Sequence, residues 1–227
     1  MNIIDDPVGA APITAAVEHD RPTVRVKELS ERDRHRILRH FLALNEDDRT
    51  LRFGMSIKDA LITQYVDRLD FSRDTIFGVY TSNFKLIGVG HLAFAPREAF
   101  PDSVSATLKE RVAEFGVSVS ASGRGQGVGS KMFERAAIHC RNADVDTLYM
   151  HCLSSNRVMI HIAKKAGMEI HRDHGEADAY LKLLPASPGT VFREAVEEQV
   201  ASFDYALKAN TRAAVKWLEN LPGFKGD

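Results

Sequence analysis

The sequence lacks most of the features that mark secreted, membrane or zinc-binding proteins. Cysteine is scarce: Cys140 and Cys152 are the only two in 227 residues, and they form no C-x-x-C pair, which excludes a disulfide framework and a zinc ribbon. The first twenty residues contain no Lys or Arg, unlike a secretory or transit signal. No apolar run approaches the roughly 18 residues of a membrane span. A soluble protein of the reducing cytoplasm is therefore expected.

An excess of charge of one sign is missing too. The 30 basic and 31 acidic residues give a formal net charge of -1 and are mixed along the chain, without the basic run of a phosphate-backbone binder. Nucleic acid is therefore not an expected partner. With 44% apolar residues the chain can build one sizeable core. We expect a flexible arm over 1–22, one main domain over 23–185 and a helical extension over 186–227.

Hydrophobic periodicity predicts an α/β (α+β) fold with a mixed, mostly antiparallel central sheet flanked by helices. The two predicted strands around Thr81–Phe84 should form a hairpin. Ser30 and Asp33 resemble a capping box, and Ser155 is a candidate N-cap. The predicted strands cover 23–29, 75–80, 85–95, 108–119, 148–153, 168–170 and 180–184, and the predicted helices cover 30–42, 57–69, 128–140 and 155–166.

Beyond Pro185 and Pro188 the pattern predicts a long amphipathic helix. Its apolar seam advances by alternating four and three residues. Two interpretations stay open: the seam makes a homodimer with Asn210 setting the register, which we prefer, or the helix folds back on its own domain. The seam consists of Val196, Val200, Phe203, Leu207, Asn210, Ala214, Trp217 and Leu221.

A glycine-rich loop, Gly123–Ser130, lies between a predicted strand and a predicted helix. Unpaired amides at a helix start attract anions, glycine lets the backbone approach phosphate oxygens, and Arg124 adds a permanent positive charge. A P-loop would need Gly-Lys-Ser/Thr, but Ser130-Lys131 follows Gly129. The dinucleotide pattern G-x-G-x-x-G also fails on spacing. The loop therefore suits a pyrophosphate outside the two common nucleotide motifs.

The arrangement that does fit is Arg-x-x-Gly-x-Gly, formed by Arg124, Gly127 and Gly129. Here the sequence resembles the GNAT superfamily of N-acetyltransferases over roughly Thr23–Leu184. The strand before the loop, Asn156 after the next strand, and a helix closed by Lys165-Ala166-Gly167-Met168 stand at the intervals that this family uses.

The resemblance implies that acetyl-CoA is the cosubstrate. The main chain of Val117 and Val119 would hydrogen-bond the pantetheine arm, and Asn156 would hydrogen-bond its end. The alternative for Asn156 is a residue that only starts a helix. The pyrophosphate would lie on Arg124, Gly125, Gln126, Gly127, Val128, Gly129 and Ser130.

Acyl transfer to an amine needs a base, a donor for the developing oxyanion and a proton for the departing thiolate. By resemblance Glu114 is the candidate base, directly or through a water, and the N–H near Val117 is the oxyanion donor. Glu110 is the reserve base. The alternative for Glu114 is an ordinary exposed strand residue.

The usual proton donor is missing. Many family members place a tyrosine seven residues after the asparagine, next to the coenzyme sulfur, and here that position is Ala163. Ser155, His161 or Cys152 could substitute, or the thiolate could leave unassisted, because an alkyl thiol has a pKa of only about 8.5.

The predicted function is therefore an N-acetyltransferase that moves the acetyl group of acetyl-CoA to a primary amine by direct transfer in a ternary complex. The alternative is a weak or inactive acyl-CoA-binding regulatory module, which Ala163 favours. A nucleotide-binding protein is a third reading. The acceptor, a small molecule or a protein or peptide, would be selected by Asn45–Asp70 and Pro96–Lys109. No metal is predicted, because His171-x-x-His174 is typical of a solvated turn.

Overall fold

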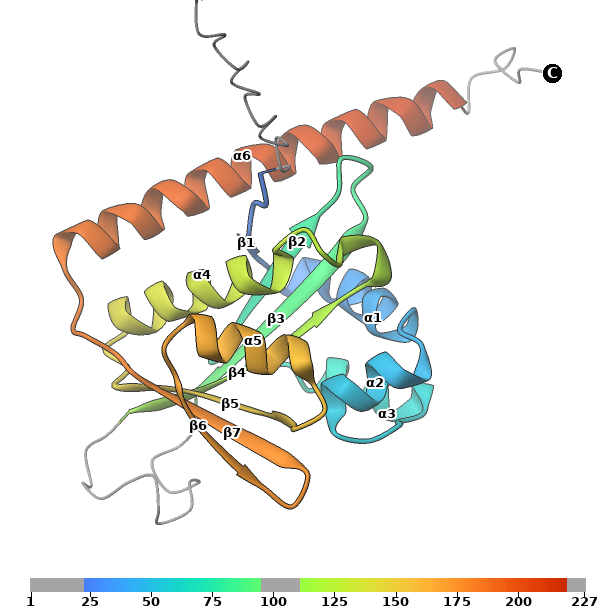
Figure 1. Ribbon diagram of the computed structural model, residues 1–227. Helices are drawn as coiled ribbons and strands as arrows, with labels where there is room; N and C mark the ends of the chain where they lie inside the picture. Colours follow the sequence, from blue (N-terminus) through green and yellow to red (C-terminus); the bar gives the residue numbers. More distant parts are fainter. Residues whose placement is uncertain (1–22, 95–110, 220–227) are drawn as a thin grey trace, which may run out of the picture.

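The computed structural model describes residues 23–94 and 111–219. The predicted arm (1–22), the predicted acceptor segment Pro96–Lys109 and the reserve base Glu110 lie outside the described residues. The described chain forms one sheet with helices on both of its faces (Figure 1).

The sheet has seven strands in the order β1-β2-β3-β4-β5-β7-β6. Among the described strands, β4 and β5 form the one parallel pair, and the other neighbouring pairs are antiparallel. This confirms the predicted mixed, mostly antiparallel sheet and the β2–β3 hairpin. The strands are β1 (Lys27–Glu28), β2 (Thr75–Tyr80), β3 (Leu86–Phe94), β4 (Val112–Val119), β5 (Thr147–Leu153), β6 (Glu169–Asp173) and β7 (Glu176–Lys182).

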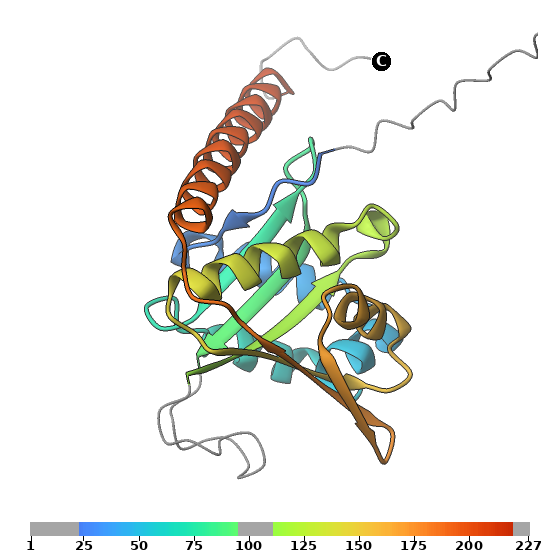
Figure 2. The same cartoon turned by 60° about the vertical axis from the view of Figure 1, so that its left-hand side comes forward.

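Two hydrophobic cores lie on opposite faces of the sheet, one under α1–α3 and one under α4 and α5 (Figures 1 and 2). Successive side chains of a strand point to opposite faces. Ile76 therefore belongs to the cluster of Phe41, and its neighbour Phe77 to the cluster of Met132. The helices are η1 (Glu31–Asp33), α1 (Arg34–Leu42), α2 (Glu46–Phe53), α3 (Asp59–Asp67), η2 (Ala121–Gly123), α4 (Val128–Asn142), α5 (Arg157–Lys165) and α6 (Pro188–Glu219).

Helix α2 was not predicted from the sequence. It has no buried residue, so it carries no apolar period that would reveal it. Its start is nevertheless encoded locally, because the side chain of Asn45 accepts a hydrogen bond from the Asp48 N–H at 2.8 Å. Gly54 ends the helix with φ 77°.

Several predicted boundaries were wrong. The first strand shrinks to two residues, and the last two strands are longer than predicted because they form a hairpin. The capping box of Ser30 and Asp33 is confirmed, but it opens the short η1 turn before α1. Ser155 does not cap α5. The cap is Asn156, whose side chain accepts from the Met159 N–H at 3.1 Å.

The parallel pair β4–β5 separates part of the way along its length. Its register runs from Val112 opposite Thr147 to Glu114 opposite Tyr149, and β4 then continues to Val119 without this partner. Backbone groups on the β5 side of β4 are thus left without a strand neighbour beyond Glu114. The glycine loop and α4 follow at the far end of this cleft.

Helix α6 folds back on its own domain, but not through the predicted seam. Ala201 is buried, and the Tyr205 ring packs against Tyr80 and Phe84 near the β2–β3 turn. The predicted apolar seam points away: Phe203 and Leu207 are 73% and 58% exposed. Side chains are described only as far as residue 213, so the end of the seam lies outside them.

Ion pairs fasten α6 to α4. Glu194 accepts from Arg135 at 2.5 Å and lies 2.7 Å from a ring nitrogen of His139. Burial alone would raise the pKa of Glu194, but the hydrogen bonds from His139, Arg135 and Asn142 hold it down at about 2. Arg135 is only 2% exposed, and its second carboxylate partner, Glu198, lies at 3.4 Å, so removal of Glu194 would leave a buried charge with only this longer contact.

Candidate active site

The glycine loop has the backbone geometry of an anion cradle. Gly125 and Gly127 have φ of 73° and 76°, a region that side chains rarely allow, and a Cβ at either position would meet open space. Gly127 is the N-cap of α4, so the first amides of that helix have no intrahelical partner. Val128 packs into the core, so only its backbone faces the loop.

Arg124, the expected phosphate ligand, is paired with a carboxylate of the protein. Its guanidinium donates to Asp48 of α2, while the side chain stays about half exposed at 51%. Gln126 also binds within the loop, donating to the Ser122 carbonyl at 2.8 Å. An incoming phosphate would therefore compete with Asp48 for Arg124.

Asn156 is buried at the start of α5. Its oxygen caps α5, and its amide donates to the Leu51 carbonyl of α2 at 3.3 Å. These contacts fit the structural interpretation of this residue, and its role as a coenzyme ligand stays a prediction.

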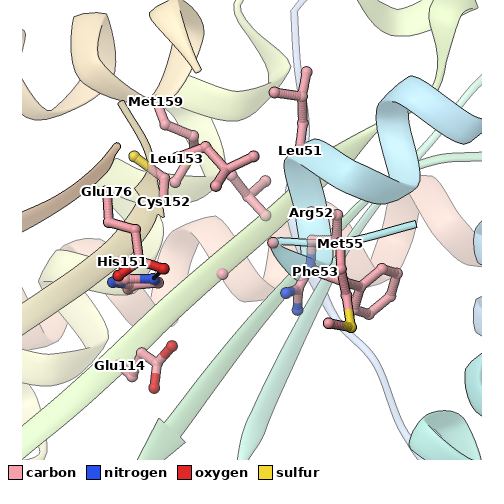
Figure 3. A pocket seen from close by; sticks show the side chains of 13 residues that line it. Leu51, Arg52, Phe53, Met55, Glu114, His151, Cys152, Leu153, Met159 and Glu176 are labelled. Carbon is pink, nitrogen blue, oxygen red and sulfur yellow. Dashed lines mark ion pairs between the residues drawn. The ribbon is translucent and has the colours of Figure 1, made fainter. Parts of the chain in front are cut away.

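A cavity of about 400 Å³ opens where β4 and β5 separate. One wall is made by strands β4, β5 and β7, and the opposite wall by the end of α2 (Figure 3). The lining residues are Leu51, Arg52, Phe53, Gly54, Met55, Glu114, Gly116, Val117, His151, Cys152, Leu153, Met159 and Glu176. The structure thus brings the predicted base and the predicted oxyanion donor into one cavity.

The strand wall carries the predicted base Glu114 and two titratable side chains that the sequence did not reveal, His151 and Glu176. Glu114, His151 and Glu176 all project there (Figure 3). A ring nitrogen of His151 lies 2.8 Å from Asp178, which also accepts from the Tyr149 hydroxyl at 2.6 Å. Burial would raise the pKa of Asp178, but these two hydrogen bonds lower it, so it stays an anion that orients the imidazole.

The observation that could have pointed to His151 is its partner in the strand pairing. His151 stands directly opposite Asp178 on the antiparallel neighbour, and cross-strand partners can meet. That pairing is visible only once the strands β5 and β7 are known to be neighbours.

The helix wall carries one cation, Arg52. Its guanidinium hydrogen-bonds the Tyr65 hydroxyl at 2.9 Å and lies over the rings of Phe41, Phe53 and Tyr65. It also touches β4: a Cβ added at Gly116 would meet its nitrogens at 2.9 Å. A side chain at Gly116 would therefore displace this guanidinium.

Of the three predicted substitutes for the missing proton donor, the structure places one in the cavity lining and two outside it. Cys152 lines the cavity, and burial raises the pKa of its thiol, so it is neutral at pH 7. Ser155 and His161 are exposed outside the cavity lining. Ala163 is buried in the core beneath α5.

Within residues 23–94 and 111–219, no cluster of three or more His, Cys, Asp or Glu side chains is arranged to hold a metal ion. His171 and His174 are 61% and 92% exposed. In the same residues no helix has the length and apolar character needed to span a membrane.

Comparison with known proteins identifies the family. The model of the acetyltransferase (GNAT) family matches residues 27–168, which is more than half of the chain. The chain belongs to the GNAT family. Its members are acetyltransferases, so the protein is an acyltransferase enzyme. Among curated proteins, none matches the sequence.

Solved structures show the same GNAT fold at low identity. The GNAT domain of S. lividans PAT has a TM-score of 0.57 at 18% identity, with 70% of this chain and 90% of that chain covered. Spermidine N-acetyltransferase from Vibrio cholerae, solved with CoA and spermine, has 0.52 at 17%, covering 70% and 95%. A Salmonella typhimurium structure solved with acetyl-CoA has 0.53 at 12%, covering 73% and 96%.

Proposed function

We propose that this GNAT protein moves the acetyl group of acetyl-CoA to a primary amine by direct transfer in a ternary complex. One observation carries the proposal: a glycine cradle and a carboxylate-bearing cavity lie at the two ends of one cleft along β4. A ligand with an anionic end and a reactive end matches that arrangement.

The path of the coenzyme follows from the direction of β4. The cradle comes after Val119, so a pyrophosphate bound there starts at the carboxyl end of the strand. The pantetheine arm then runs back along the unpaired side of β4 past Val119 and Val117. Its thioester arrives beside Gly116 and Glu114, in the cavity.

The acetyl transfer uses the strand wall. Glu114 takes the proton from the amine, directly or through a water, as its nitrogen attacks the thioester carbonyl carbon. The N–H near Val117 donates to the oxygen that becomes anionic. His151, held by Asp178, lies on the same wall, and we assign it to orient the attacking amine. The carboxylates of Glu114 and Glu176 favour a cationic acceptor.

The test separates binding from turnover. Calorimetry with acetyl-CoA and with CoA measures the cradle, and thiol release across a panel of small amines and lysine peptides measures transfer. We expect micromolar binding and turnover of at least one amine. ATP should not compete, and effective ATP competition would favour the nucleotide-binding reading.

A second candidate is a regulatory module that binds acyl-CoA without turnover. Ala163, packed in the core where many family members carry a tyrosine, is the observation that favours it. Tight coenzyme binding with silence across the whole amine panel, and no effect of Glu114→Gln on any readout, would support this candidate over the enzyme.

We further propose a cytoplasmic homodimer that forms through α6. The support for the dimer is the exposed seam of Val196, Val200, Phe203 and Leu207, which the protein's own domain does not cover. Free Cys140 and Cys152 fit a reducing compartment.

Sedimentation of the full chain tests the dimer. Phe203→Glu should convert it to monomer, while Ala195→Glu, exposed on the same helix but turned away from the seam, should have a smaller effect. A wild-type monomer at high micromolar concentration would contradict the proposal.

A further inference from the structure

The polar network behind Arg52 has no part in the chemistry described above. The Tyr65 hydroxyl bonds the guanidinium of Arg52 and, on its other side, a ring nitrogen of His91 at 2.8 Å. The second ring nitrogen of His91 lies 3.0 Å from Asp74. Four side chains from α2, α3, β3 and the turn before β2 thus form one chain of hydrogen bonds that ends in the cavity.

Arg52 is held firmly but not fully satisfied. Three aromatic rings surround its guanidinium, with the ring centroids at 5.1 to 5.8 Å. Its Nε is buried and finds no hydrogen-bond partner within the described part of the chain. A buried donor without a partner costs about 1–3 kcal/mol, so the protein keeps this cation on the cavity wall at a cost in stability.

Among residues 23–94 and 111–219, no carboxylate forms an ion pair with Arg52. Burial raises the pKa of Tyr65, and burial lowers the pKa of His91 against the opposing effect of Asp74, so both stay neutral near pH 7. These two neutral groups separate the guanidinium from the carboxylate of Asp74. The groups that face it across the cavity are Glu114, His151 and Glu176 (Figure 3).

We propose that Arg52 stabilises the coenzyme A thiolate as it leaves, replacing the proton donor that Ala163 does not supply. The inference rests on the proposed function, because that path brings the thioester to Gly116, against which the guanidinium lies. Tyr65, His91 and Asp74 act as positioning residues that keep the cation in place.

With Arg52 in this role, acetyl transfer needs no general acid. The amine nitrogen forms a bond to the carbonyl carbon and gives its proton to Glu114. The tetrahedral intermediate then breaks its C–S bond, and the electron pair leaves on sulfur. The guanidinium stabilises that negative charge electrostatically, as a fixed cation does for a developing anion. The thiolate takes up the proton later, from Glu114 or from water.

The deciding measurement is the pKa of the thiol of CoA bound to the intact protein, followed by the ultraviolet absorbance of the thiolate during a pH titration. A free alkyl thiol titrates near about 8.5, and a cation at close range should lower this by about one unit or more. In Arg52→Gln the value should return to that of free CoA, and Arg52→Lys should keep part of the shift. Lys85→Gln, an exposed cation outside the cavity, is the matched control and should change nothing.

A purely structural role of Arg52 predicts a different result. It would lower thermal stability in Arg52→Gln but leave the thiol titration of the bound coenzyme unchanged, which would overturn the inference. If Arg52→Gln does not fold, Tyr65→Phe carries the test: loss of its hydrogen bond should raise the thiol pKa part of the way.

Turnover and binding complete the test. In Arg52→Gln, kcat should fall about tenfold or more with the Kd for CoA within about threefold of wild type. Failure of the wild-type protein to bind CoA in calorimetry would remove the proposed function and this inference together. Binding with a thiol pKa equal to that of free CoA would overturn the inference alone.

Discussion

The glycine loop and the cavity are built by different means, although both lie on β4. The loop is one continuous segment, with Gly125 and Gly127 setting its backbone and α4 beginning inside it. The cavity collects residues from α2, β4, β5, β7 and α5. The comparison teaches that the expected coenzyme contacts are local main-chain groups, whereas the chemistry depends on side chains that only packing brings together.

The largest expected effect on coenzyme binding comes from a substitution in the glycine loop. Gly127→Asp places a carboxylate at φ 76° where the phosphate should lie, and like charges in contact cost several kcal/mol. The affinity for acetyl-CoA should fall about 1,000-fold or more in calorimetry. Gly167→Asp, at φ 73° after α5, imposes the same backbone strain away from the cleft and should bind normally. Equal affinity of both variants would refute the cradle.

At the cavity, Glu114→Gln should affect turnover and spare binding. Removal of a general base costs about 10²- to 10⁴-fold in rate, so kcat should fall within that range while the Kd for acetyl-CoA stays unchanged. Glu134→Gln, an exposed carboxylate on α4, is the control. A kcat that barely moves would assign the proton to another group.

A third test concerns β4, the strand that joins the two regions, and the pH dependence of the protein's stability. His40 of α1 is buried and hydrogen-bonds Ser118 of β4 at 2.9 Å. Burial lowers its pKa to about 4, so the unfolded chain binds a proton between pH 6.5 and 4 that the native state does not. Stability should therefore be fully present above pH 6.5 and decline as the pH falls toward 4, by up to about 3 kcal/mol.

The measurement for His40 is urea unfolding at several pH values. His40→Gln should be less stable overall, but its stability should depend less on pH within this window. An unchanged pH slope would show that other groups are responsible.

The smallest expected effect concerns the orientation of His151. Asp178→Asn and His151→Gln should each reduce kcat/KM about tenfold, and the double variant should lose no more than the single ones, because Asp178 acts through His151. Steady-state kinetics with the best amine of the panel provide the readout. Additive losses would mean that the two residues act independently.

The extent of sequence prediction follows the same division. The hairpin of β2 and β3, the strand before the loop and the helix after it were predicted because their signals lie within short windows. Helix α2 was missed, since its stability comes from Arg49 and Arg52 reaching other segments and not from an apolar stripe. Arg52 lies within Asn45–Asp70, the stretch predicted to select the acceptor, but without α2 nothing in the sequence placed its side chain on the cavity wall.

The tail helix shows the limit of periodicity. Its length and its apolar seam were readable, but the face that packs on the domain carries many charged side chains: Glu194, Asp204 and Lys208 bond Arg135, Arg25 and the Tyr80 carbonyl. Charged side chains predict exposure unless their partners are known.

By itself the sequence determined the order of the strands and of the helices with an apolar stripe, the glycine loop and the family motif, because these depend on backbone conformation and on neighbours a few residues apart. Only the tertiary structure decided how the side chains near the cleft are arranged. His151 pairs with Asp178, the guanidinium of Arg52 lies against Gly116, and the side chain of Asn156 caps its own helix. The first two contacts join residues that are distant in the chain, and the third depends on the orientation of a side chain. Both are fixed only when the strands and helices pack.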